Sequence, residues 1–182
     1  MQIHRLRQSI QVGDGTIIDK LMPTIIDSGV LYSEIIVNRT ACALTALNVL
    51  KCWGYNIYGQ VGDGTNINKT IPTVIDSGTS YTQIITNGSS CGITSTGTLK
   101  CWGQNDAGQV GNGTTVDKYF PVIIDSGVAY QNITIRSSTT YAQTKYTNEI
   151  KSWGANSFGQ MGDSTINDYF RYFPRIIMNW LN

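Results

Sequence analysis

Cysteines are the residues of this sequence whose type and spacing most clearly allow chemistry. They form two pairs with the same spacing, Cys42 with Cys52 and Cys91 with Cys101. Such pairs can form disulfides, stay reduced as small buried apolar side chains, or bind zinc. The chain has no Cys-x-x-Cys motif and a single histidine, His4, which disfavours zinc. We predict two disulfides, and four reduced thiols stay the alternative.

A third copy of the same sequence pattern lacks both cysteines. Ala142 and Ser152 are predicted to take their places. Joint loss indicates that the two members of a pair depend on each other, as bonded cysteines do. Disulfides persist in oxidising compartments, so the prediction places the protein outside the cell or at the cell surface. Residues 1–13 lack the apolar stretch of a secretory signal.

Glycine-rich loops are a second candidate for chemistry. Gly-Asp-Gly-Thr at residues 13–16 and 62–65, and Gly-Asn-Gly-Thr at 111–114, look like loops for calcium or phosphate. They lack the ligand spacing of a calcium loop and the Gly-Lys-Ser/Thr ending of a phosphate loop, and tight turns explain them without a ligand. With only two glutamates, Glu34 and Glu149, no catalytic constellation is evident. We therefore expect no enzyme activity, no cofactor and no metal.

The composition disfavours two further classes of partner. The formal net charge of +1 is too small to attract nucleic acid. Hydrophobic residues make up 41% of the chain, but their runs are too short to cross a bilayer. We therefore expect neither nucleic-acid binding nor membrane insertion.

The candidate residues recur because the sequence repeats. Ile-Asp-Ser-Gly begins at residues 26, 75 and 124, a spacing of 49 each time. Cys-Trp-Gly begins at residues 52 and 101, and Ser-Trp-Gly at 152. Several motifs in one order at one period define a repeat protein. We divide a single repeat domain, residues 1–182, into repeats 12–60, 61–109 and 110–160 and a partial repeat 161–182, with residues 4–11 as an eroded piece of an earlier copy.

Short alternating runs separated by turn residues predict strands within each repeat. In the second repeat we expect strands at 71–75, 82–86, 90–94 and 99–102. Four short strands in about 50 residues are typical of a propeller blade. A three-residue loop ending at Gly97 would place Cys91 opposite Cys101, because glycine adopts the left-handed backbone that this loop requires. Asn48 and Asn148 are the equivalent residues, and asparagine is the next most tolerant type.

Tryptophans and the C-terminal segment complete this expectation. Trp53, Trp102 and Trp153 are predicted to pack between blades rather than to form a ligand platform. Residues 169–178 are predicted to be a strand that completes a sheet, either in this chain or in another copy. The predicted fold is all-β, with about three blades of four antiparallel strands and a partial fourth.

A recurring pattern, W-G-x-N-x-x-G-Q-h-G with h apolar, runs through residues 53–64, 102–113 and 153–163. This pattern resembles the repeat of the regulator of chromosome condensation family. The paired cysteines are similar to those of a subset of bacterial cell-surface and secreted members. The resemblance implies a β-propeller, usually of seven blades. Members of the family include a guanine-nucleotide exchange factor for a small GTPase and a protein inhibitor of beta-lactamase.

Three blades are fewer than a closed propeller needs, so the chain is expected to be part of a longer propeller or to associate with copies of itself. We predict a non-catalytic protein-interaction module, with a self-assembling subunit as the alternative and an exchange-factor-like regulator as a lesser one. Positions that differ between the repeats inside the shared pattern can carry function without disturbing the blade. The candidate partner-binding residues are Tyr55, Tyr58, Gln104, Asp106 and Phe158. Packing of these side chains between blades is the competing interpretation.

Overall fold

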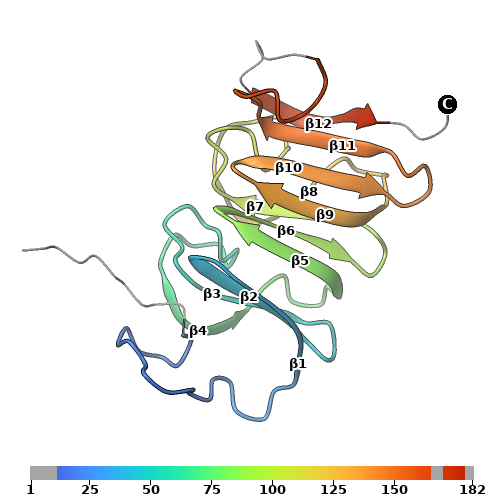
Figure 1. Cartoon of the computed structure of the whole chain (residues 1–182). Coiled ribbons are helices and arrows are strands. Elements are labelled where there is room, and N and C mark those ends of the chain that lie inside the picture. The colour runs from blue at the N-terminus through green and yellow to red at the C-terminus, as the bar shows by residue number, and fades with distance from the viewer. Residues whose placement is uncertain (1–11, 165–169, 179–182) are drawn as a thin grey trace, which may run out of the picture.

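Strands make up all the regular structure of the residues that the computed structural model describes, 12–164 and 170–178 (Figure 1). They form three four-stranded antiparallel sheets, called here blades 1, 2 and 3. Blade 1 contains β1 (Tyr32–Val37), β2 (Thr40–Thr45), β3 (Leu50–Gly54) and β4 (Lys69–Val74). Blade 2 contains β5 (Tyr81–Asn87), β6 (Ser89–Thr94), β7 (Leu99–Gly103) and β8 (Lys118–Ile123). Blade 3 contains β9 (Tyr130–Arg136), β10 (Thr139–Thr144), β11 (Ile150–Ala155) and β12 (Phe170–Met178). The predicted all-β fold of four-stranded blades is confirmed.

The central hairpin of blade 2 has the predicted register. Cys91 lies directly opposite Cys101 across β6 and β7, and the two are bonded, with their Cα atoms 4.1 Å apart. Gly97 ends the connecting loop with a φ of 86°. Asn48 and Asn148 occupy the same left-handed region, with φ values of 61° and 56°. The loop therefore takes the conformation that its last residue permits.

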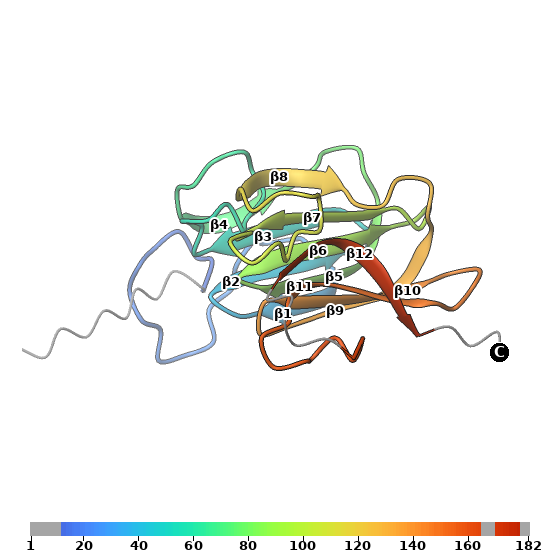
Figure 2. The same cartoon turned by 90° about the horizontal axis from the view of Figure 1, so that it is seen from above.

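Neighbouring blades pack face to face around apolar clusters (Figures 1 and 2). The cluster between blades 1 and 2 contains the bonded Cys42 and Cys52 together with Trp102. Its counterpart between blades 2 and 3 contains the other disulfide and Trp153. Each large side chain buried in this way contributes about 1.5 to 3 kcal/mol to stability. The prediction that the tryptophans pack between blades is confirmed for Trp102 and Trp153, whereas Trp53 lies in a separate cluster with Ala41 and Ala43.

Residues 12–31 cover part of the face of blade 1 that points away from blade 2. Gly13 lies against the indole of Trp53, and Ile26 packs on a small cluster with Ala41 and Ala43. The segment thus covers the tryptophan of blade 1, as the loop glycines Gly62 and Gly111 of the preceding blades cover Trp102 and Trp153. The eroded copy predicted at residues 4–11 lies outside the described residues.

The partial C-terminal repeat supplies the outer strand of blade 3. β12 pairs with β11 of the same blade, so of the two predicted alternatives the structure has the pairing within this chain. Tyr169, the first residue of that predicted strand, is outside the described part. Each blade takes its outer strand from the residues that follow the loop after its tryptophan. A blade therefore straddles two of the sequence repeats rather than coinciding with one.

One equivalence drawn from the sequence is wrong. Tyr141, not Ala142, lies opposite Ser152 across β10 and β11, while Ala142 faces Lys151. The reason is a loop that is one residue longer: Thr144 bonds to the carbonyl of Glu149, whereas Thr94 of blade 2 bonds to that of Thr98. Counting back from the tryptophan at a fixed offset therefore misses the true position by one residue.

Candidate protein-interaction face

A buried asparagine organises the loop that follows each tryptophan. In blade 1, Asn56 Oδ1 accepts a 2.8 Å hydrogen bond from the backbone N–H of Val61. Its Nδ2 donates to Asp63 Oδ1 at 3.1 Å and to the carbonyls of Thr65 and Ile67 at 3.0 Å each. Asn105 makes the same set of bonds in blade 2. The loop backbone is therefore held from inside, which leaves its outward side chains free to vary.

The next blade completes each of these tryptophan loops. The carbonyl oxygen of Gln60 accepts hydrogen bonds from Trp102 Nε1 at 3.0 Å and from Ser90 Oγ at 2.8 Å. Gly62 lies directly under the same indole, where a Cβ atom would come within 2.5 Å of Nε1. Only glycine fits so close to the ring, and its φ of 88° also favours glycine. The loop is rigid because two blades hold it.

The first two predicted partner-binding residues lie together. The rings of Tyr55 and Tyr58 meet edge to face, with centroids 6.3 Å apart. The guanidinium of Arg39, from the turn between β1 and β2, lies 6.0 Å from the centroid of Tyr55. A cation over an aromatic face is attracted by the ring quadrupole. Tyr58 is 37% exposed, so this aromatic–cation cluster (Arg39, Tyr55, Tyr58) reaches the surface.

The other three predicted residues lie on the loops of the other blades. Gln104 is half-buried beside Gly88, and Asp106 accepts a 3.0 Å hydrogen bond from Gln109 Nε2. Phe158 of blade 3 is 92% exposed. All three loops leave the same end of their blades, since each follows the third strand. Of the five predicted residues, Tyr55 and Tyr58 of blade 1 lie together in one cluster, whereas Gln104, Asp106 and Phe158 lie on the two other loops.

A recurring Asp–Tyr–Lys cluster is a feature of the structure that the sequence analysis does not predict. Asp76 Oδ2 accepts hydrogen bonds from the Tyr81 hydroxyl and from Lys100 Nζ, each at 2.6 Å. Burial raises the pKa of Asp76, but the bonds from Lys100 and Tyr81 outweigh it, so the net pKa lies below its ordinary value. The same cluster forms around Asp27 and Asp125. A lysine two residues before each tryptophan was the available signal.

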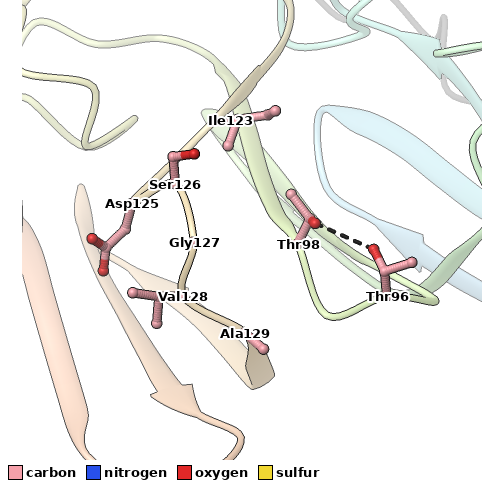
Figure 3. Close-up of a pocket in the computed structure, with 8 residues that line it drawn as sticks. All are labelled: Thr96, Thr98, Ile123, Asp125, Ser126, Gly127, Val128 and Ala129. Carbon is pink, nitrogen blue, oxygen red and sulfur yellow. Dashed lines mark hydrogen bonds between the residues drawn. The ribbon is translucent and has the colours of Figure 1, made fainter.

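The opposite end of the blades carries two shallow hollows lined by hydroxyl groups. One, of about 240 Å³, lies between the turn at residues 125–129 and the hairpin that carries Thr96 and Thr98 (Figure 3). A neighbouring hollow of about 370 Å³ shares both threonines and reaches Lys100. In the described part of the chain, no three His, Cys, Asp or Glu residues gather as a metal site would require. No helix in those ranges has the length and apolar character to cross a membrane.

The match of this chain to a known family includes the start of one of the tryptophan loops. The family profile described as Regulator of chromosome condensation (RCC1) repeat matches residues 87–109, which run from the end of β5 into the second loop. The chain therefore contains a segment that matches the regulator of chromosome condensation repeat. No curated protein sequence gives a match. Membership of the cysteine-paired, secreted subset of that family stays a prediction.

Three solved structures resemble this chain in fold over most of its length. Prp20p from Saccharomyces cerevisiae aligns with a TM-score of 0.72 and 19% identity over 82% of this chain and 39% of its own. Yeast RCC1 (Prp20) bound to Kap60 gives 0.70 and 20% over 82% and 37%. Human WBSCR16 gives 0.68 and 18% over 79% and 39%. The chain thus spans about two fifths of these proteins, and at such identities the likeness shows the fold alone.

Proposed function

We propose that this chain is a non-catalytic protein-interaction module and that the aromatic–cation cluster is its principal contact. The observation that carries the proposal is the cluster of Arg39, from the turn between β1 and β2, with Tyr55 and Tyr58, from a loop whose backbone two blades hold. Tyrosine and arginine dominate binding energy at protein interfaces. A rigid loop loses little entropy on binding, which raises the affinity available from a few side chains.

The binding partners of a structurally similar yeast protein support a protein as the partner. Prp20p has binding properties to Gsp1p and histones, and yeast RCC1 (Prp20) forms a complex with Kap60. Those statements concern the yeast protein. For this chain we propose a protein surface that offers an apolar side chain beside a carboxylate, which would meet the tyrosine rings and the Arg39 guanidinium respectively.

Site-specific photocrosslinking tests this assignment. A photoreactive side chain at Tyr58 is compared with one at Thr96, which is exposed at the opposite end of the blades. In extracts of the source cells, we expect Tyr58 to give a discrete crosslinked protein that Thr96 does not give. Arg39→Ala should reduce that product without changing the unfolding midpoint. Identical products from both positions, or a product insensitive to Arg39→Ala, would contradict the proposal.

A second candidate is self-association through blade 1, favoured by bare apolar side chains on β1. Ile35 is 56% exposed, whereas the equivalent Ile84 and Ile133 are 1% and 7% exposed beneath a preceding blade. We propose that a second copy of the chain covers this face in a two-fold dimer. Sedimentation of the wild type against Ile35→Lys tests it: the substitution should remove the dimer, and a wild type that stays at 20.0 kDa at high micromolar concentration would overturn it.

We also propose that the protein works in an oxidising compartment, outside the cell or at its surface. Two bonded cysteine pairs support this assignment, since such bonds are rare in the cytosol. Alkylation of free thiols in intact source cells, before lysis, should leave all four cysteines unmodified. Modification of all four would place the protein in a reducing compartment instead.

A further inference from the structure

The junctions between blades follow one rule of hydrogen bonding. In each, the carbonyl oxygen of the loop glutamine accepts from two donors of the following blade. For Gln60 these donors are Trp102 and Ser90. For Gln109 they are Trp153 Nε1 at 3.0 Å and Thr140 Oγ1 at 2.9 Å. A carbonyl placed at such a junction therefore depends on the next blade for its partners.

Blade 3 satisfies the corresponding carbonyl by itself. The hydroxyl of Tyr141 donates to the carbonyl oxygen of Gln160 at 2.6 Å. Tyr141 comes from β10 of the same blade and occupies the position that Cys91 has in blade 2, opposite Ser152. A tyrosine at this position is long enough to reach the loop carbonyl, which a disulfide cannot do. One donor from within blade 3 thus replaces the donors that a following blade would supply.

The side chain two residues further along β10 is also polar in blade 3 and apolar in the other two blades. In blades 1 and 2 the position holds Leu44 and Ile93, which are buried in the apolar clusters between blades. In blade 3 it holds Gln143, which pairs with Ile150 as Ile93 pairs with Leu99. The amide oxygen of Gln143 accepts a 2.8 Å hydrogen bond from Asn132 on β9. This side chain also has its partner within its own blade.

We propose that the outward face of blade 3 is a closed end that accepts no further blade, and that Tyr141 is the residue that closes it. Covering this face would bury a glutamine amide and a tyrosine hydroxyl where the other blades present a disulfide and an aliphatic side chain. Polar groups lose free energy on burial unless new partners replace water. Packing of further blades or further copies is therefore confined to the face of blade 1. A dimer through blade 1 would end there and would not grow into a ring or filament.

Carbonyl chemical shifts test the role of Tyr141 directly. Tyr141→Phe removes the hydroxyl and keeps the ring, so the carbonyl ¹³C resonance of Gln160 should move upfield while that of Gln109 stays in place. Thr140→Val is the matched control at an internal junction, and it should move Gln109 and leave Gln160 unchanged. An unmoved Gln160 resonance in the Tyr141→Phe protein would overturn the assignment.

Photocrosslinking tests the closed end in the otherwise unmodified protein. A photoreactive side chain at Gln143 should give no covalent dimer at high micromolar concentration, whereas one at Ile35 should give a dimer. A dimer from Gln143 would overturn the proposal. Absence of a dimer from both positions would overturn only the self-association through blade 1, since the closed face of blade 3 would still stand. The two proposals therefore fail separately.

Discussion

Replacing Tyr141 and Ser152 by cysteine should give blade 3 the disulfide that the other two blades have. The two positions lie opposite each other with the same flanking pairs as Cys91 and Cys101: Thr140 faces Trp153, as Ser90 faces Trp102. The bonded pairs of blades 1 and 2 have a sequence separation of 10 residues. The new pair would close a loop of similar length, so the bond should form on air oxidation.

The expected gain in stability follows from two opposing contributions. Closing a loop of this size restricts the unfolded chain by about 3 kcal/mol. Loss of the hydrogen bond from Tyr141 to Gln160 costs about 1 kcal/mol. The oxidised variant should therefore be about 2 kcal/mol more stable than the wild type. For a chain of this size that corresponds to a rise in melting temperature of about 4 to 8 °C.

The matched control is Ala142→Cys with Ser152→Cys, the pair that a fixed sequence offset would select. Ala142 lies opposite Lys151 and is buried against blade 2, so its side chain points to the other face of the sheet. Alkylation under denaturing conditions without reductant should find no free thiol in the first variant and two in the control. A bond in the control, or free thiols in the first variant, would refute the register described for blade 3.

Three further predictions concern features shared by the blades. Gly62→Ala should cost about 3 kcal/mol in urea unfolding because its Cβ meets the indole of Trp102, whereas Gly78→Ala, also at positive φ but in open space, should cost about 1 kcal/mol; equal losses would contradict the close contact. Asp76 has a lowered pKa, so its contribution to stability is present above the unfolded value of about 4 and is lost as pH falls through the lower folded value. Asp76→Asn should therefore flatten the acid limb of the stability curve below pH ~4, and an unchanged limb would contradict the Asp–Tyr–Lys cluster. Reduction of both native disulfides should lower the urea midpoint, and an unshifted midpoint would show that they contribute nothing to the folded state.

Periodic features of this protein were accessible from its sequence. A spacing of 49 residues with turn residues between short apolar runs predicts blades, and a glycine or asparagine at the end of the hairpin loop predicts the register of the cysteines. The blades and the hairpin register both depend on local backbone preferences, which are visible in each copy of the repeat separately. The exposure of Phe158 could not be predicted in the same way, because it depends on what covers blade 3 rather than on the loop itself.

The sequence does not predict features that depend on a loop insertion or on a side-chain contact across the repeat. An extra loop residue before Ile150 shifts β10 by one position, and no local propensity marks that insertion. Lys100 has the appearance of a solvated surface lysine, yet it reaches an aspartate 24 residues earlier in the chain. Tyr141 gives no sequence signal for its bond to Gln160, because the two meet only after the hairpin and the loop have folded.

The dependence of each tryptophan loop on the next blade has a consequence for synthesis on the ribosome. The carbonyl of Gln60 is made long before Ser90 and Trp102, its partners. At about 5 to 20 residues per second, the 42 residues that separate Gln60 from Trp102 take about 2 to 8 seconds to emerge. Each loop therefore waits for the following blade, and the nascent chain carries one unfinished loop at a time from its N-terminus onward. The loop of blade 3 does not depend on later residues in this way. Tyr141 is synthesised before Gln160, so the donor is already present when the Gln160 carbonyl leaves the ribosome.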